Sequence, residues 1–288
     1  MNDESLRVPP HSSFGLPRGR QLHFARIPLV MAIVNVTPDS FSDGGVHFDP
    51  GHAIESALQM AEDGAAIVDV GGESTRPGAA PVSAEEEIGR VLPVIEGIRA
   101  KSDAAISIDT MKCEVAQAAL DAGADMINDV TALRNDPRMR KLAAERKVPV
   151  ILMHMRGTPE TMQSLAKYDD VVWDVYRELR GVYDEARQAG VEQILVDPGI
   201  GFAKNFEHNV ALLKRCNEFA SISPFVIGAS RKKFIGHLTG RDAGPDRMAG
   251  SLAAVAAAAR GGASIVRVHD VRETVDFLRV ISAIEAAS

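Results

Sequence analysis

Eight short apolar runs divide this chain at regular intervals, and each is followed by polar or glycine residues and then by a helical stretch. The runs with their polar ends finish, in chain order, at Asn35, Thr75, Asp109, Asn128, His154, Asp197, Lys232 and His269. Continuous apolar runs are typical of strands buried on both faces of a parallel sheet, with helices as crossover connections. Eight such units in 288 residues predict an α/β fold, a single (β/α)8 (TIM) barrel with its active site at the C-terminal ends of the strands.

The alternation of strands and helices continues from Leu29 to the C-terminus without a linker rich in proline, glycine or serine, which indicates one domain. We assign residues 27–288 to the barrel. Residues 1–26 are expected to be a flexible N-terminal extension, whose last part could close the bottom of the barrel. This extension contains charges and prolines but no apolar core, so it matches neither a signal peptide nor a membrane span.

The composition restricts the class of protein. A net charge of −7 argues against general binding of nucleic acid, which usually requires a basic face. The chain has only two cysteines, Cys113 and Cys216, which lie far apart and outside any metal-ligand spacing. We interpret them as ordinary buried or half-buried thiols in a reducing compartment, with the cytoplasm as the expected location.

Helices are predicted between the strands. A serine before three glutamates is typical of a helix start, as at Ser83, and a glycine is typical of a helix end, as at Gly123. Pro93 is expected to kink or divide the helix that contains it. The predicted helices cover residues 52–62, 83–101, 112–123, 137–147, 169–188, 205–219, 246–260 and 271–287.

Two polar loops follow the first two strands. The first, NVTPDSFSDGG, carries Asp39, Ser40 and Phe41, and we expect it to be a mobile loop that closes over a ligand. A surface turn built on its proline and glycines is the alternative. The second, DVGGESTRPGA, presents Thr75 and Arg76, which suit an anionic ligand. Its alternative role is to cap the helix that follows.

Three acceptor side chains, Asp109, Asn128 and Asp197, end three different strands. Converging on one barrel mouth, they would match a flat heterocycle that is rich in hydrogen-bond donors. Aspartate and asparagine in such positions also cap helices, but Thr110 and Asp129 are one step further along and are better placed for that.

Basic residues follow the last two strands, where barrels commonly bind phosphate. The sequences SRKK and RVHD supply Arg231, Lys232, Arg267 and His269. A solvated basic run is the alternative, but it fits Arg267 poorly, because this residue interrupts an apolar strand where an unpaired charge is costly.

Three further residues lie at or just after strand ends. Phe202 follows a Gly-x-Gly turn and could stack on a planar ligand or pack against the rim of the barrel. His154 is interpreted as a hydrogen-bonded core residue, and Met153 beside it as a residue that could line the pocket. The sequence contains no HExxH, CxxC, GxSxG or P-loop pattern, so a zinc hydrolase, serine hydrolase or P-loop kinase is unsupported.

Taken together, these motifs resemble the dihydropteroate synthase family. NVTPDSFSDGG, VGGESTRPGA, IDT, NDV, DPGIGFAK, GASRK and RVHDV occur in the family's order from about Leu29 to the C-terminus. The family usually has glycine where this chain has Ala32, a one-methyl change that affects no catalytic residue. The resemblance implies transfer of a dihydropterin from 6-hydroxymethyl-7,8-dihydropterin pyrophosphate to p-aminobenzoate, with release of pyrophosphate.

The resemblance also implies roles for individual residues. Catalytic roles fall on Asp109, Asp197, Lys232, Arg267 and His269, and Asn35 is implied as the ligand of a Mg2+ cofactor. The implied contacts with substrates are the pterin with Asp109, Asn128, Asp197, Lys232, Met153 and Phe202, p-aminobenzoate with Thr75, Arg76, Pro77 and Ser230, and pyrophosphate with Asn35, Arg267, His269 and Thr75.

Two other functions share this kind of barrel. A methyltetrahydrofolate-type pterin methyltransferase would need the pterin site without the pyrophosphate site, and the basic residues after the last two strands argue against it. A non-catalytic pterin-binding paralogue usually loses site residues, and none is lost here. The resemblance further implies competitive inhibition by sulfonamides, a homodimer, and no nucleic-acid or membrane partner.

Overall fold

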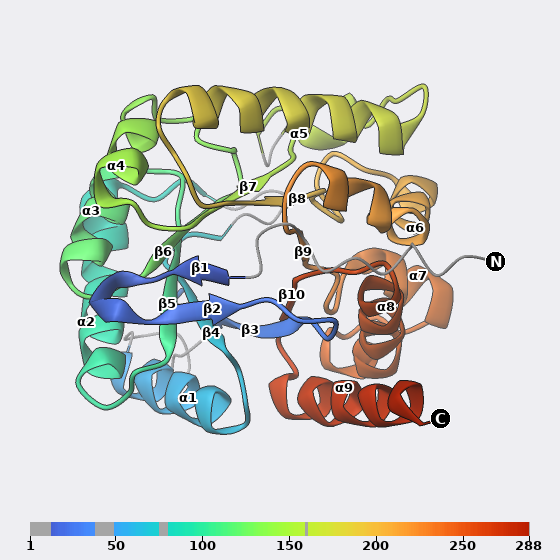
Figure 1. The fold of residues 1–288 in the computed structure, drawn as a ribbon, viewed down its shortest axis with the longest axis horizontal. Coiled ribbons are helices and arrows are strands. Elements are labelled where there is room, and N and C mark those ends of the chain that lie inside the picture. The colour runs from blue at the N-terminus through green and yellow to red at the C-terminus, as the bar shows by residue number, and fades with distance from the viewer. Residues whose placement is uncertain (1–12, 38–48, 75–79, 159–160, 288) are drawn as a thin grey trace.

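The computed structural model describes residues 13–37, 49–74, 80–158 and 161–287. Within these residues eight parallel strands form one sheet in the order β8-β7-β6-β5-β4-β3-β10-β9. A parallel bridge between Val196 and Phe225 joins the two ends of this sheet, so it curls into a barrel. Helices surround the barrel on its outside (Figure 1). The predicted (β/α)8 fold is confirmed.

Each of the eight predicted runs contains one strand of the barrel. The strands are short and almost wholly buried, as expected for strands covered on both faces. Their bounds are β3 (Leu29–Asn35), β4 (Ile67–Gly71), β5 (Ala105–Asp109), β6 (Met126–Asp129), β7 (Val150–Met153), β8 (Ile194–Asp197), β9 (Val226–Ile227) and β10 (Ile265–Val268).

The predicted helices are present, with three differences. Helix α2 is not divided at Pro93, the segment predicted over residues 205–219 ends as a 3-10 helix (Cys216–Ser221), and α7 was not predicted. Ser83 caps α2 as expected, because its side chain accepts a hydrogen bond from the Glu86 N–H. The helices are α1 (Pro50–Glu62), α2 (Ala84–Arg99), α3 (Cys113–Asp121), α4 (Arg138–Arg146), α5 (Val171–Gln188), α6 (Phe206–Lys214), α7 (Lys233–Thr239), α8 (Met248–Arg260) and α9 (Val271–Ala286).

The segment before the barrel forms an antiparallel hairpin of β1 (Ser13–Gly15) and β2 (Gln21–His23). In Figure 1 the hairpin lies across the strands at the end of the barrel that faces the viewer. Phe14 and Phe24 are buried there, with ring centroids 5.1 Å apart in an edge-to-face arrangement. The last part of the extension therefore closes the barrel bottom, as one part of the prediction stated, and apolar side chains hold residues 13–26 there in a hairpin that was not predicted. Residues 1–12 lie outside the described residues.

A buried carboxylate fastens the hairpin to the barrel. Asp125, just before β6, is fully buried and accepts hydrogen bonds from Arg18 at 2.6 Å, from Arg99 at 2.7 Å and also from Arg20. It also accepts from the Ile106 N–H at 2.9 Å. A buried charge is costly unless it is paired and hydrogen-bonded, and here both carboxylate oxygens are used.

None of the helices in the described parts of the chain is long and apolar enough to cross a membrane. Cys113 and Cys216 are both buried and free, as expected for structural thiols.

Candidate active site

The strand register brings the predicted acceptors together at the C-terminal end of the barrel. Asp109 of β5 pairs in register with Asn128 of β6, and Gly71 of β4 lies beside Asp109 on the other side. Asn35, the last residue of β3, pairs in register with Gly71. Asp197 ends β8, which is joined to β6 through β7. The five positions therefore lie at one end of the barrel.

Arg267 of β10 lies at the centre of this mouth. Its Nε donates to Asp69 Oδ2 at 2.6 Å, and its Nη2 donates to Asp109 Oδ2 at 2.7 Å. Burial lowers the pKa of Arg267, but the two carboxylates outweigh burial and raise it. The charge that interrupts the apolar strand is therefore paired, and the guanidinium bridges Asp69 of β4 and Asp109 of β5.

Asn128 is oriented by the same carboxylate. Its Nδ2 donates to Asp69 Oδ2 at 3.0 Å, which assigns its Oδ1 as the acceptor that remains for another partner. Asp69 is fully buried, and its Oδ1 has no hydrogen-bond partner among the described residues. Sequence reasoning missed Asp69. The signal was available, since an aspartate within the apolar run IVDVG is as unusual as the arginine within IVRV.

Asp109 is a carboxyl group with an altered proton affinity. Burial raises its pKa to about 7, the charge of Arg267 lowers it in part, and the neighbouring Asp69 raises it again. Ionisable groups with such shifts cluster at functional sites, because binding and catalysis place charges where water cannot stabilise them. The neighbour Thr110 accepts from the Lys112 N–H at 3.2 Å, so the local turn is stabilised by Thr110 and not by Asp109.

Asp197 is held by the turn that follows it. Its Oδ1 accepts from the Gly199 N–H at 2.7 Å, and Gly199 has a positive φ of 68°. A Cβ at Gly199 would lie 2.1 Å from the His154 carbonyl oxygen, so only glycine fits there. Burial raises the pKa of Asp197, while the Gly199 hydrogen bond and the charges of nearby cations, led by Lys232, oppose that rise.

Ser230 and His269 meet at the ends of β9 and β10. Ser230 Oγ lies 3.1 Å from His269 Nδ1 and also accepts from the His269 N–H at 3.2 Å. Burial and the charges of Arg231 and Arg267 lower the pKa of His269 to about 4, so its imidazole is neutral near pH 7. Arg231 itself pairs with Asp270.

Lys232 and Phe202 contact each other across the mouth. The Lys232 ammonium lies 4.3 Å from the centroid of the Phe202 ring, a cation–π geometry. The half-buried ring also packs on an apolar cluster that includes Met153, Met155 and Met162. Phe202 therefore packs against the rim of the barrel, which is one of the two roles predicted for it, and Met153 lies in the wall beneath it.

Six predicted site residues fall in segments that the structure does not describe. They are Asp39, Ser40 and Phe41 of the first loop and Thr75, Arg76 and Pro77 of the second. The two ends of the second loop are anchored by Glu73, which accepts from the Val82 N–H at 3.0 Å and from Lys112 Nζ at 2.7 Å. Lys112 also pairs with the buried Glu87 at 2.5 Å. This anchor was not predicted.

His154 is a buried, hydrogen-bonded residue, as expected. Its Nε2 lies 3.0 Å from Glu178 Oε2, and its Nδ1 lies 3.0 Å from the buried Lys204 Nζ. Burial lowers the pKa of His154 to about 4. Lys204, which follows Phe202 by two residues, was missed as a residue of this region.

Asn35 is the residue of this site that was predicted to bind a metal ion. Within the described ranges no group of three or more histidine, cysteine, aspartate or glutamate side chains could hold a metal ion. Asn35 is half-buried at the end of β3 and offers a hard amide oxygen. Mg2+ takes oxygen ligands, usually few from the protein and the rest from phosphate and water, so this donor fits Mg2+ that arrives with a phosphorylated ligand.

The family of pterin binding enzymes matches residues 31–269 of the chain. A dihydropteroate synthase from Escherichia coli (strain K12) is 50% identical over 260 residues, which cover 89% of this chain and 91% of the relative. A dihydropteroate synthase from Synechocystis sp. is 45% identical over 273 residues, covering 93% of this chain and 94% of that protein.

Solved structures agree with the sequence comparison. A Xanthomonas albilineans dihydropteroate synthase with 4-aminobenzoic acid superposes with a TM-score of 0.88 at 48% identity, covering 94% of this chain and 97% of that one. The same enzyme in complex with 7,8-dihydropteroate gives a TM-score of 0.85 at 45% identity, covering 94% and 98%. A Yersinia pestis enzyme with a sulfonamide drug complex gives 0.89 at 42% identity, covering 96% and 100%.

Proposed function

The chain belongs to the pterin binding enzyme family, and from that premise we propose that its barrel mouth carries out the dihydropteroate synthase reaction. The substrates are 6-hydroxymethyl-7,8-dihydropterin pyrophosphate and p-aminobenzoate, and the products are 7,8-dihydropteroate and pyrophosphate. The observation that carries this proposal is the set of acceptors Asp109, Asn128 and Asp197 at one end of the barrel, with Arg267 between them. The relatives named above supply the reaction.

The pterin is assigned to the three acceptors. A pterin edge presents an amino group beside ring N–H groups, and paired oxygens fix both its affinity and its orientation. Lys232 is assigned as a donor to the ring acceptors, and Phe202 and Met153 as walls of the pocket. Asp69 belongs to this site as well, because it orients both Asn128 and Arg267 through one oxygen.

Pyrophosphate is assigned to the side of the mouth formed by β10 and β3. His269 is neutral and has an N–H to donate, while Arg267 uses two of its five N–H donors on Asp69 and Asp109. Asn35 would hold Mg2+ through its amide oxygen, and the bound ion would neutralise charge on the pyrophosphate oxygens. Thr75 is assigned to the same group from the resemblance.

The second substrate is assigned to the rim. Ser230 and the loop residues Thr75, Arg76 and Pro77 would contact p-aminobenzoate, and closure of the first loop, with Asp39, Ser40 and Phe41, would exclude water. We expect this pocket to form late, after pyrophosphate is bound. Tight binding of p-aminobenzoate to the empty enzyme would contradict that order. Sulfonamides, which one solved relative holds, would compete at this position.

The chemistry follows from the charges of the site. The methylene C–O bond breaks, its electron pair leaves with pyrophosphate, and the aniline nitrogen forms the new C–N bond and then loses a proton. That nitrogen is neutral near pH 7, so the site needs no strong base to create the nucleophile. The protein contributes alignment of the two reactants and stabilisation of developing charge.

We further propose that bond breaking precedes bond formation. Positive charge would then spread into the dihydropterin ring, where Asp109 and Asp197 can stabilise it. Replacing Asp109 by asparagine should slow pyrophosphate release more than it weakens pterin binding. Equal losses in both quantities would argue against this order.

The test of the function is pyrophosphate release from the pterin substrate with Mg2+, with and without p-aminobenzoate, while dihydropteroate is followed. Release and product that both depend on p-aminobenzoate would support the synthase. Binding of the pterin without turnover would indicate the non-catalytic paralogue, and absence of pterin binding would reject the proposal. Light scattering of the same sample tests the proposed homodimer.

A further inference from the structure

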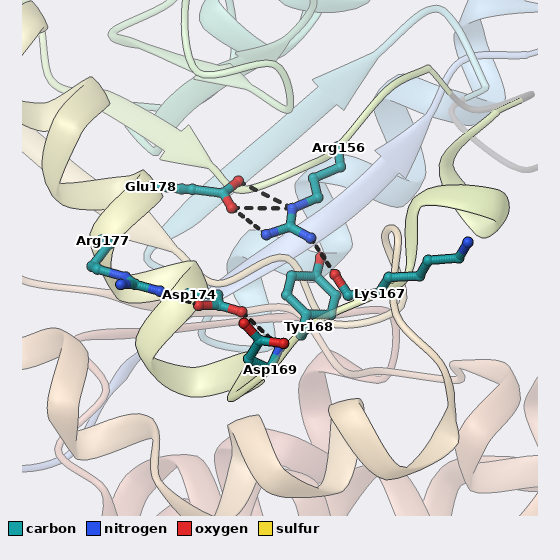
Figure 2. Close-up of a pocket in the computed structure, with 7 residues that line it drawn as sticks. All are labelled: Arg156, Lys167, Tyr168, Asp169, Asp174, Arg177 and Glu178. Atoms are coloured by element: carbon teal, nitrogen blue, oxygen red, sulfur yellow. Dashed lines mark hydrogen bonds and ion pairs between the residues drawn. The ribbon is translucent and has the colours of Figure 1, made fainter.

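A chain of hydrogen bonds runs from the surface of α5 to the floor of the mouth. At its outer end Glu178 pairs with Arg156, and Figure 2 shows this pair beside Tyr168 in a polar pocket. Arg156 also donates to the Lys167 carbonyl oxygen at 2.5 Å, and its guanidinium lies 4.0 Å from the centroid of the Tyr168 ring. Glu178 is therefore held in place at the surface.

The chain continues inward through His154. Hydrogen bonds from Arg156 and His154 outweigh the effect of burial and lower the pKa of Glu178 to about 2, so the carboxylate accepts. His154 must then donate from Nε2, and its Nδ1 carries the lone pair that accepts from Lys204 Nζ. The Glu178 carboxylate thus fixes the tautomer in which the nitrogen that faces the lysine is unprotonated.

Lys204 is the inner end of the chain. It is 3% exposed, and its Nζ donates to the Phe202 carbonyl oxygen at 2.8 Å as well as to His154. The segment that it holds is also fixed by Tyr168, whose hydroxyl donates to the Ala203 carbonyl oxygen at 2.9 Å. The backbone of His154 in turn donates to the Asp197 carbonyl oxygen at 2.8 Å, so the histidine that holds Lys204 is bonded to the residue that ends β8.

Burying a lysine side chain is unfavourable unless its ammonium is hydrogen-bonded or paired with an opposite charge. Burial lowers the pKa of Lys204 to about 7, although Asp197 and Glu178 favour its charge, and Arg156 and Lys232 oppose it. In the other direction, the charge of Lys204 favours the ionised form of Asp197. The two groups therefore support each other's charges across the floor of the mouth.

We propose that Lys204 is a positioning residue of the pterin pocket. His154 and the Phe202 carbonyl hold its ammonium near Asp197, and that charge keeps Asp197 a carboxylate acceptor for the pterin edge. Glu178 acts through His154 by fixing the tautomer that accepts from Lys204. This inference rests on the proposed function, since it concerns the pterin site of the same reaction.

The test measures the dissociation constant of dihydropterin pyrophosphate by calorimetry, with the Michaelis constant for p-aminobenzoate as the second readout. Lys204→Met should weaken pterin binding about tenfold, the scale of a lost hydrogen bond or charge contact to an ionised group. The constant for p-aminobenzoate should stay within about twofold, because neither Asp197 nor Phe202 is assigned to p-aminobenzoate. The control is Lys214→Met, an exposed lysine at the end of α6, which should change neither value.

Two further comparisons separate positioning from a general structural role. In an Asp197→Asn background the Lys204→Met effect should fall below about twofold, because the group through which it acts is gone. An undiminished effect there would overturn the proposal, as would pterin binding by Lys204→Met within about twofold of the unmodified protein. His154→Gln, which keeps an acceptor and a donor, should bind pterin better than His154→Leu, and equal binding would also count against the proposal.

Failure of the proposed function would look different. If the unmodified protein does not bind the pterin, the function and this inference both fail. If it binds the pterin and makes dihydropteroate while Lys204→Met matches it, only the role of Lys204 is wrong.

Discussion

The two ends of the barrel each contain a cluster of arginine and aspartate, with the proportions reversed. At the bottom, one carboxylate, Asp125, receives three guanidinium groups from Arg18, Arg20 and Arg99. At the mouth, one guanidinium, that of Arg267, pairs with the two carboxylates of Asp69 and Asp109.

The clusters differ in how completely their carboxylates are hydrogen-bonded, although Arg20 Nε at the bottom is also buried without a partner among the described residues. Both oxygens of Asp125 accept hydrogen bonds from side chains and from the Ile106 N–H. At the mouth, Asp69 Oδ1 is buried with no partner among the described residues, and burial raises the pKa of Asp109 to about 7. A buried carboxylate oxygen without a partner calls for an explanation, and the proposed substrate site at the mouth offers one. We therefore propose that the bottom cluster stabilises the fold and that the mouth cluster binds substrate, in line with the division between the two ends of such barrels.

The largest expected effect is that of removing the central guanidinium. Arg267→Met should reduce turnover by about 100- to 1000-fold, the range seen when a preorganised charge-stabilising donor is lost. Steady-state kinetics of dihydropteroate formation would measure it. Arg260→Met at the exposed end of α8 is the control and should keep normal turnover. Turnover of Arg267→Met within tenfold of normal would contradict the proposed role of the mouth cluster in the reaction.

The corresponding change at the bottom should affect stability and leave catalysis unchanged. Asp125→Ala leaves three arginines without their shared carboxylate, and breaking a buried ion pair costs about 3–5 kcal/mol of the free energy of unfolding. Urea denaturation would measure this loss, and turnover should be normal at temperatures where the variant is folded.

Asp121→Ala is the matched control for that experiment. Asp121 pairs with Arg146 at 2.6 Å, with both side chains substantially exposed, so its loss should cost about 0–1 kcal/mol. If Asp125→Ala lost turnover in its folded state, the bottom cluster would have a functional role and the comparison would fail.

Much of the fold could be predicted from the sequence, because each barrel strand is a local apolar run. The eight strands and the acceptors at their ends need only the chain order and the rule that parallel strands end at one edge. The hairpin at Phe14 and Phe24 was missed, since its strands are three residues long and are stabilised by packing on a distant part of the chain. Local pattern carries little information about such contacts.

The site was predictable in its outline but not in its pairing. Arg267 was recognised as functional, but its partners Asp69 and Asp109 lie 198 and 158 residues away in the sequence. Lys204 was missed for a similar reason, because a lysine after a glycine turn looks solvated until His154 and Phe202 are seen to enclose it. The fold brings these groups together, and their contacts cannot be read from the individual residues in the sequence.

Asp109 should give a pH effect of intermediate size. With its pKa raised to about 7, Asp109 is protonated below that value and loses its role as an anionic acceptor. The kcat/KM for the pterin substrate should therefore fall as pH decreases through about 7, and Asp109→Asn should lack this decline. A pH–rate profile of both proteins tests this, and an unchanged decline in the variant would assign it to another group.

Stability should respond to pH in the opposite sense. A folded pKa of about 7 against an ordinary value of 3.8 means that the folded state binds the extra proton between those values. Asp109 therefore favours the folded state below the ordinary value, and this contribution is lost as pH rises toward 7. Relative to the unmodified protein, Asp109→Asn should become more resistant to urea as pH rises through this window. Its activity should be lower than that of the unmodified protein over the same window.

The smallest expected effect concerns the link between the hairpin and the barrel bottom. Gln193 accepts from the Gly15 N–H at 2.6 Å and donates to the Gly15 carbonyl oxygen at 3.0 Å. Gln193→Ala should cost about 1 kcal/mol of the free energy of unfolding, a typical net value for such bonds. Faster hydrogen exchange at the amides of β1 and β2 would report the loss, with Gln188→Ala at the exposed end of α5 as the control.

Turnover of Gln193→Ala then decides how independent the two ends of the barrel are. Gln193 immediately precedes β8, and Asp197 ends that strand at the mouth. If hairpin exchange rises while kcat and KM stay normal, four residues of strand are enough to isolate the pterin acceptor from changes below it. If KM for the pterin rises in step with exchange, β8 transmits the disturbance, and the bottom of the barrel contributes to the geometry of the site as well as to stability.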